Sequence, residues 1–482
     1  MVAVARHSVR AAGVMAAFLL ACALVAAGGR DPAAVVFVLT ALMTVFLAGG
    51  VHLATRSRAG RLDRVGSFVL LLLLWLGLPV LGAIPVAATT SLGPMGAWFE
   101  TVCAITTTGS CALHSLDDVP RATLAWLLCL QWFGGLLTLV GVVAVLAPAG
   151  IGGLPDRAAR AAEFGLSEAT EIDDAIRHVL PVYGGATVLC MLALFAVGVG
   201  GLDAFGLASA AISTGGLLPD ADGIAAYGDV AVKLVLIVFM LVGGTSLLWQ
   251  RMILSRRFRL AFGQTENFAV LLVCGVVGLL VGAVSFRAGH GEIGLPLAVE
   301  DGLFTAVSLV TTTGVEPHAG AFASLPLGFV LVLLCIGGAT FSTSGGLKMY
   351  RVGAALMQSL RDLNRLIYPH AVRPRRLRAG GVEPQAMTAI WLCLSASGLL
   401  IAVCAAMIAP AMPSFEATYV AVIAALTNAG AVFTANWAGS SAWPDWGDVP
   451  DYAKIALAAL MILGRLEILV VLGLVHFGFW RR

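Results

Sequence analysis

Long apolar runs alternate with short basic segments along most of the chain. The runs at 11–27, 33–51, 65–84 and 124–146 each approach the roughly 20 residues that an α-helix needs to cross a bilayer. Only 12% of the 482 residues are charged, whereas roughly 25% are charged in a typical soluble domain. The pattern predicts an all-α integral membrane protein with the lipid bilayer as its main solvent.

The basic segments fall between alternate apolar runs, so they can share one side of the membrane. If that side is the cytoplasm, as the positive-inside rule requires, both termini are cytoplasmic and the number of crossings is even. The remaining Lys and Arg residues, outside or within a span, are Arg30, Arg121, Lys233, Arg287, Lys454 and Arg465.

One design occurs four times along the chain: an apolar run, a short apolar stretch, a polar loop with glycine, and a second apolar run. The glycines follow one another at intervals of roughly 100 residues. We therefore expect two leading helices over 1–64 and repeats over 65–155, 156–260, 261–378 and 379–482. The loops read Thr106-Thr107-Thr108-Gly109, Ile212-Ser213-Thr214-Gly215, Thr311-Thr312-Thr313-Gly314 and Thr427-Asn428-Ala429-Gly430.

The stretches before these glycines, at 98–105, 203–212, 304–310 and 415–426, are too short to span the membrane, which predicts re-entrant half-helices. Acidic residues lie near their starts. Asp203 and Asp301 are placed to cap helix N-termini, where negative charge is favourable, although solvated loop carboxylates are an equal alternative. The acidic residues in question are Glu100, Asp203, Glu300, Asp301 and Glu416.

All four loops lie one crossing from a basic segment, so the positive-inside argument places them on the extracellular side. The repeats are then parallel and related by an axis along the membrane normal. Non-helical backbone inside a membrane is tolerated only where protein or water covers it, and its carbonyl groups can replace the hydration shell of a cation. We interpret the four loops as the lining of one pore for a monovalent cation.

The residues of these loops and of several helices resemble the Trk/Ktr/HKT superfamily of K⁺ transporters, specifically its TrkH-type members. The resemblance runs from about residue 65 to the C-terminus. The second loop departs from the family because Leu-Leu follows its glycine pair, and the fourth lacks the usual Gly-Pro-Gly. The motifs are Phe99-Glu100 to Gly109, Gln131-Trp132-Phe133-Gly134-Gly135, Ser342 to Lys348, and Gly464-Arg465-Leu466-Glu467-Ile468.

The resemblance implies four parallel helix–pore helix–helix repeats around one pore after two extra transmembrane helices, ten spans in all. It implies K⁺ uptake across a bacterial cytoplasmic membrane, with K⁺ as the transported ion and no organic cofactor. The implied filter residues are Thr107, Thr108, Gly109, Ser213, Thr214, Gly215, Thr312, Thr313, Gly314, Asn428, Ala429 and Gly430. The implied K⁺ ligands are Thr108, Gly109, Thr214, Gly215, Thr313, Gly314, Asn428 and Gly430.

Two partners also follow from the resemblance: a second copy of the chain, giving a homodimer, and a cytoplasmic TrkA-like regulatory subunit that binds NAD or another nucleotide. The basic segments 251–259 and 361–378 are candidate docking surfaces, or simply follow the positive-inside rule. A nucleic-acid partner is not expected. The chain has no H-E-x-x-H or G-x-S-x-G motif, so we do not expect an enzyme. Coupled transport, channel-like transport and a non-conducting subunit are left as alternatives.

The second span of the third repeat contains a run of glycines and hydroxyl residues that would make a poor continuous helix. We expect a break that faces a cavity, and by resemblance an intramembrane gate; a kinked helix packed through its glycines is the alternative. The gate residues are Gly337, Gly338, Thr340, Ser342, Thr343, Ser344, Gly345 and Gly346.

Arg465 and Glu467 lie in an otherwise apolar run, where charged side chains are costly and usually face a cavity or a partner. Two positions apart, they point to different faces of a helix and cannot simply pair with each other. The resemblance places Arg465 in the pore below the filter, as a barrier to cations. A structural salt bridge to another span is the alternative.

Overall fold

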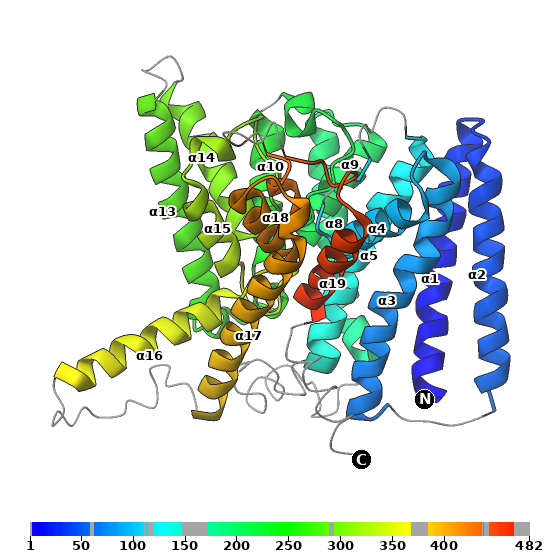
Figure 1. Cartoon of the computed structure of the whole chain (residues 1–482), viewed down its shortest axis with the longest axis horizontal. Helices are drawn as coiled ribbons and strands as arrows, with labels where there is room; N and C mark the ends of the chain where they lie inside the picture. The colour runs from blue at the N-terminus through cyan, green and yellow to red at the C-terminus, as the bar shows by residue number, and fades with distance from the viewer. Residues whose placement is uncertain are drawn as a thin grey trace.

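The computed structural model describes residues 2–57, 62–109, 112–113, 119–146, 172–228, 230–288, 294–367, 384–435, 437 and 443–466. Within these ranges the regular structure is helical and no strand occurs. Two leading helices, α1 (Val2–Gly28) and α2 (Ala33–Thr55), pack against each other at one edge of the molecule (Figure 1). The predicted all-α membrane fold is confirmed.

The four repeats follow in chain order, each with a short helix between longer ones. Repeat 1 contains α3 (Arg64–Thr89), α4 (Pro94–Ile105), α5 (Arg121–Gly141) and the π-helical η1 (Val142–Leu146). Repeat 2 contains α8 (Ile172–Ala196), α9 (Gly201–Ser213), η3 (Gly223–Tyr227), α10 (Val230–Gly244), α11 (Leu247–Leu254) and α12 (Phe258–Ala261). Repeat 3 contains α13 (Thr265–Ala288), α14 (Leu295–Val310), η4 (Phe322–Ser324), α15 (Leu327–Ile336) and α16 (Met349–Ile367). Repeat 4 contains α17 (Pro384–Ile408), η5 (Ala409–Ala411), α18 (Phe415–Thr427), η6 (Gly430–Val432) and α19 (Asp451–Leu466).

Seven described spans are long and apolar enough to cross a membrane: α1, α2, α3, α5 with η1, α8, α13 and α17. α10 and α11 make an eighth if they count as one span, although they are bent by 105° at their junction. The other two crossings that the sequence predicts correspond to α15, which stops at Ile336 before the glycine-rich segment, and to α19, described as far as Leu466.

The outer helices expose apolar side chains and the central short helices are buried, as expected for a membrane protein. Large apolar side chains are exposed on the outer helices, for example Leu24 on α1 and Phe46 on α2, which is 79% exposed. Such a surface would be unstable in water but suits hydrocarbon. The pore helices α4, α9, α14 and α18 are instead largely buried by the longer helices around them (Figure 1).

The predicted capping of pore helices by Asp203 and Asp301 is wrong. The third pore helix begins at Leu295, with a proline in its first turn, nine residues before the predicted start at Phe304. Asp301 therefore lies inside α14 and does not cap it, and Glu100 lies inside α4. Asp203 does lie in the first turn of α9, but the N-cap residue is Gly200, with no side-chain cap bond.

Candidate ion-conduction site

All four pore helices end in the same turn. One residue in each takes a left-handed backbone conformation: Thr107, Thr214, Thr312 and Asn428, with φ of 53°, 50°, 59° and 54°. The amide of the next residue then donates to the carbonyl five residues earlier, at 2.9 Å in every repeat. These bonds are Thr108 to Cys103, Gly215 to Ala210, Thr313 to Ser308 and Ala429 to Ala424. The turn leads each chain out of its helix into a non-helical loop.

This turn corrects the alignment of the second repeat. Counted from the left-handed residue, the glycines that correspond are Gly109, Gly216, Gly314 and Gly430, so Gly215 lies at the position of Thr108 in the first loop. A methyl group added at Gly216 would lie 2.9 Å from the Thr313 carbonyl oxygen in the next loop. Sequence spacing could not choose between two adjacent glycines, whereas the end of α9 does.

The four loops meet one another in the order of the chain and close into a ring. Their residues are almost completely buried, including the hydroxyl groups of Thr107, Thr108, Thr312 and Thr313. The contacts around the ring are Gly109 with Gly216, Gly216 with the Thr313 carbonyl, Gly314 with Ala429, and the Gly430 amide with the Thr108 carbonyl oxygen at 2.6 Å. Because each loop follows a helix C-terminus, four helix dipoles place partial negative charge around this ring.

Side chains outside the ring hold each loop in place. The Gln131 amide group accepts from the Leu217 amide at 3.0 Å and donates to the Leu217 carbonyl at 3.1 Å. The Trp446 indole donates to the Gly430 carbonyl oxygen at 3.3 Å, and the Ser308 hydroxyl donates to the Val315 carbonyl at 2.6 Å. The Glu100 carboxylate accepts from the Ala112 amide. Sequence reasoning missed Trp446 and Ser308, because neither belongs to a motif.

The glycine-rich segment between α15 and α16 is a loop, and a continuous kinked helix is excluded. Gly337, Phe341 and Gly346 all have positive φ, which no α-helix contains. The Thr343 hydroxyl donates to the Ile212 carbonyl oxygen at 2.9 Å, at the end of pore helix α9. The structure therefore places this segment (residues 337–348), which we call the gate loop after the role that the resemblance implies, against the ends of the pore helices.

Two further contacts join the gate loop to the third and fourth repeats. The Gly345 amide donates to the Thr312 hydroxyl at 2.6 Å. On its other side, Gly345 packs so tightly against the Thr427 carbonyl oxygen that no side chain would fit there. The loop residues Thr340, Ser342, Thr343 and Ser344 are at most 2% exposed. The loop thus fills the space beneath the ring.

Arg465 links the gate loop to the first repeat. Its Nε donates to the Thr106 carbonyl oxygen at 2.6 Å, and the guanidinium also donates to the Thr107 hydroxyl and the Thr343 carbonyl. The side chain is 4% exposed. The ion pairs among the described residues do not include Arg465. Glu467 lies outside the described residues.

Comparison with known proteins decides the family. The TrkH family, described as "Cation transport protein", matches residues 35–476. The chain belongs to this family. It is 30% identical to the "Trk system potassium uptake protein TrkH" of Vibrio parahaemolyticus, over 99% of each protein. It is 29% identical to the Escherichia coli K12 protein of the same name, over 94% of this chain and 93% of that one.

A solved structure agrees with this assignment. The crystal structure of the potassium transporter TrkH from Vibrio parahaemolyticus superposes with a TM-score of 0.85, at 28% identity and 98% coverage of both chains. This TrkH family member therefore shares the overall fold of a solved TrkH.

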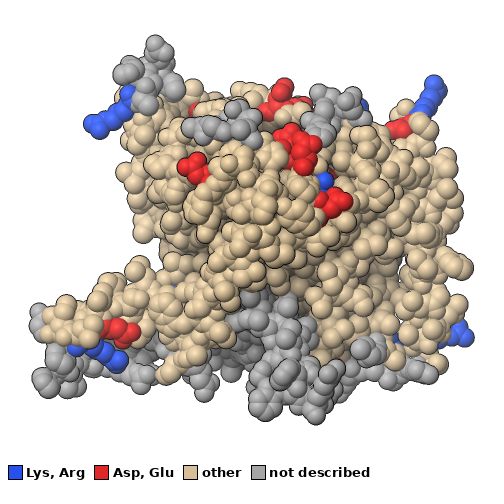
Figure 2. Space-filling view, in the orientation of Figure 1, with Lys and Arg blue, Asp and Glu red and all other residues tan. Residues whose placement is uncertain are grey.

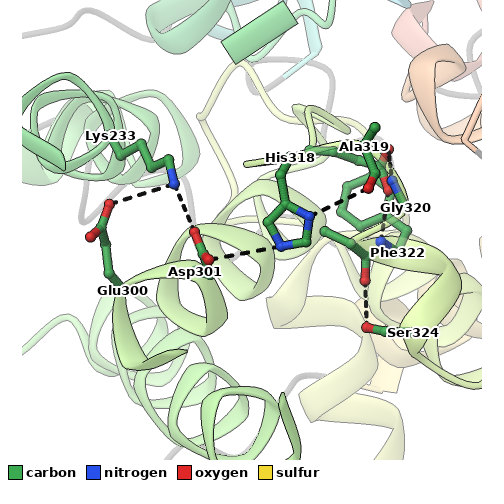
Figure 3. Close-up of polar contacts among 10 residues, drawn as sticks. Lys233, Glu300, Asp301, His318, Ala319, Gly320, Phe322 and Ser324 are labelled. Atoms are coloured by element: carbon green, nitrogen blue, oxygen red, sulfur yellow. Dashed lines mark hydrogen bonds and ion pairs between the residues drawn. The ribbon is translucent and has the colours of Figure 1, made fainter. Parts of the chain in front are cut away.

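This TrkH family member carries a cluster of charged residues that joins α10 of repeat 2 to α14 of repeat 3 (Figure 3). Lys233 Nζ on α10 lies 2.8 Å from Asp301 Oδ1 and 3.9 Å from Glu300 Oε1, both on α14. His318 Nε2 lies 3.8 Å from the other Asp301 oxygen. Asp301 thus tethers the third pore helix to its neighbour, which explains a carboxylate in the interior of that helix.

The segment that follows Gly314 is held by a second carboxylate. Glu316 accepts from the Gly320 amide at 3.2 Å and from the Phe322 amide at 2.7 Å. Burial raises the pKa of Glu316 above its usual range, although these bonds and His318 act in the opposite direction.

Acidic side chains gather on the side of the molecule where the pore helices begin (Figure 2). Charges of this kind raise the local concentration of cations by electrostatic focusing. This distribution fits an acidic vestibule on this side of the molecule. Exposed acidic residues lie in the segment before α10, at the start of α18, and before and at the start of α19: Asp220, Asp222, Glu416, Asp445, Asp448 and Asp451.

Proposed function

We propose that this protein takes up K⁺ across the bacterial cytoplasmic membrane through the ring of four loops. The observation that carries the proposal is the turn repeated at the ends of four pore helices, which brings four non-helical backbone segments to one centre. Helix C-termini and backbone carbonyls are the groups that stabilise a partly dehydrated cation. Membership of a cation transport family and relatives named as potassium uptake proteins support the choice of ion.

The ion ligands would come from the residues that the sequence indicates, namely Thr108, Gly109, Thr214, Gly215, Thr313, Gly314, Asn428 and Gly430. The alignment of the turns adds Gly216 to this set. The Thr108 carbonyl oxygen accepts the Gly430 amide, and its second lone pair is left for an ion.

Control would lie directly beneath the ring. The gate loop blocks the path while Thr343 and Gly345 are hydrogen-bonded at the ends of α9 and α14 and Gly345 packs against the end of α18. Arg465 adds a fixed positive charge at the same level. In this arrangement both termini are cytoplasmic, a second copy of the chain forms a homodimer, and a TrkA-like nucleotide-binding subunit acts on the gate loop from the cytoplasm.

Uptake of Rb⁺, a K⁺ substitute, in a bacterium that lacks its own K⁺ uptake tests the proposal. We expect the wild-type chain to restore Rb⁺ uptake. Gly109→Ser should abolish this uptake or alter its ion selectivity, because a side chain at position 109 would collide with Gly216. Uptake no greater than that of cells without the protein, with the chain present in the membrane, would refute it.

The gate is tested separately by deleting residues 340–344. The deletion removes the Thr343 hydroxyl, which binds the end of α9, and the Thr340 groups that bind Glu266, so we expect faster Rb⁺ flux through purified protein in liposomes. Unchanged flux through well-folded protein would contradict a gate at this place.

A further inference from the structure

Two consecutive polar residues at the start of α13 bind the breaks of two neighbouring repeats. Glu266 Oε1 accepts from both the amide and the hydroxyl of Thr340 in the gate loop, at 2.5 and 2.7 Å. Asn267, which is completely buried, accepts from the Ser246 amide at 2.8 Å, in the 105° bend between α10 and α11. The start of one helix therefore holds both irregular segments.

These two segments are also bonded directly to each other. The Gly244 carbonyl accepts from the Ala339 amide at 2.9 Å, and the Leu247 amide donates to the Phe341 carbonyl at 3.0 Å. The Gly243 carbonyl accepts from the Thr343 amide at 3.2 Å. A straight helix would have used these groups internally. The bend at residues 243–247, which we call the elbow, frees them to bind the gate loop.

Side chains of both charge signs bind the gate loop. Lys348 donates to the Ser344 carbonyl and Arg465 to the Thr343 carbonyl. Glu266 is the carboxylate that the described residues place on the loop, at Thr340. Hydrogen bonds to an ionised group are stronger than the neutral bonds that join loop and elbow. Loss of Glu266 should therefore weaken the attachment of the loop more than loss of any one backbone bond.

We propose that Glu266 is a latch: a positioning residue that keeps the gate loop in its closed place through Thr340. The inference rests on the proposed function, since it assumes that the loop controls flux. It also gives a route for control from the cytoplasm. α11 runs from the elbow toward the basic segment 251–259, so a displacement of α11 reaches the gate loop through the elbow, and the latch sets how large a displacement is needed.

The test measures Rb⁺ flux into liposomes containing purified protein without any partner. We expect Glu266→Ala to raise basal flux at least about tenfold, because it removes two bonds to a carboxylate and one such bond is worth about tenfold or more, with the Rb⁺/Na⁺ preference unchanged. Glu266→Gln keeps one acceptor oxygen, so its basal flux should lie between that of the wild type and that of Glu266→Ala. Thr340→Val, which removes the hydroxyl but keeps the shape, should raise flux less. Asp362→Asn, an exposed carboxylate on α16, is the control for charge removal and should have no effect.

The double variant Glu266→Ala/Thr340→Val separates a latch from a general structural role. If the two residues act through one contact, the double variant should conduct no faster than Glu266→Ala alone. Additive effects, or unchanged or reduced flux in folded Glu266→Ala, would overturn the latch. If Glu266→Ala does not fold, the test uses Thr340→Val, Glu266→Gln and their double variant: raised flux without additivity supports the latch, and unchanged or additive flux overturns it.

The same experiment distinguishes the two levels of the argument. Absence of Rb⁺ flux in the wild type and in the 340–344 deletion would refute the proposed function itself. Flux that rises in the deletion but not in Glu266→Ala or Thr340→Val would leave the function intact and refute the latch alone.

Discussion

Arg465 offers the sharpest test of how the pathway is controlled. Its guanidinium is buried between the Thr106 carbonyl and the Thr343 carbonyl, so it acts in two ways at once. It places a positive charge beneath the ring, and it ties the gate loop to the first repeat. Replacing Arg465 with alanine removes both effects, and both changes favour ion passage.

The electrostatic part follows from the geometry. Arg465 Nε lies 2.6 Å from the Thr106 oxygen. An ion in contact with that oxygen on the far side would lie about 6 Å from the guanidinium, where two unit charges repel by about 3 kcal/mol at an effective dielectric constant of 20. This corresponds to about a hundredfold in rate if passage at that point limits flux.

Three variants separate the charge from the tie. Arg465→Ala should raise Rb⁺ flux into liposomes by up to about a hundredfold. Arg465→Gln keeps hydrogen-bond donors without the charge, so it should match alanine if repulsion dominates and the wild type if the tie dominates. Lys454→Met removes a charge from the same helix, where Nζ donates to the Gly447 carbonyl, and should leave the flux unchanged. Unchanged flux in folded Arg465→Ala would refute the reasoning.

Two further predictions concern the ring and its outer side. Gly216→Ser should abolish Rb⁺ uptake or the preference for Rb⁺ over Na⁺, because the added atoms enter the ring. Gly215→Ala instead presses on Gln131 behind the ring, so it should reduce the amount of folded protein while the preference is kept. Na⁺ competition assays distinguish the two variants, and the reverse pattern would disprove the alignment. Burial raises the pKa of Glu316, so the folded state binds its proton more tightly than the unfolded state does. Thermal stability should therefore rise as the pH falls through that raised pKa toward the usual carboxyl range. Glu316→Gln should lose this pH dependence, and an equal dependence in the variant would contradict the prediction.

The sequence determined the parts of the molecule that depend on local composition. Apolar length and charge placement require membrane helices, and the repeated glycine loops predict four related units, because these signals lie within one segment of chain. The resemblance to the TrkH family, which the comparisons confirm, rested on short motifs of the same local kind. The gate loop was also recognisable, because glycines and hydroxyl residues disfavour a helix wherever they occur together.

The tertiary structure decided what depends on contacts between distant segments. The place of Asp301 follows from Lys233 on a neighbouring repeat, and the choice of Gly216 follows from where α9 ends against the other loops. Trp446 and Glu266 meet their partners only after the chain has folded. These pairings cannot be predicted from local sequence, because a hydrogen bond or ion pair depends on distances between segments that only the packing of the folded chain determines.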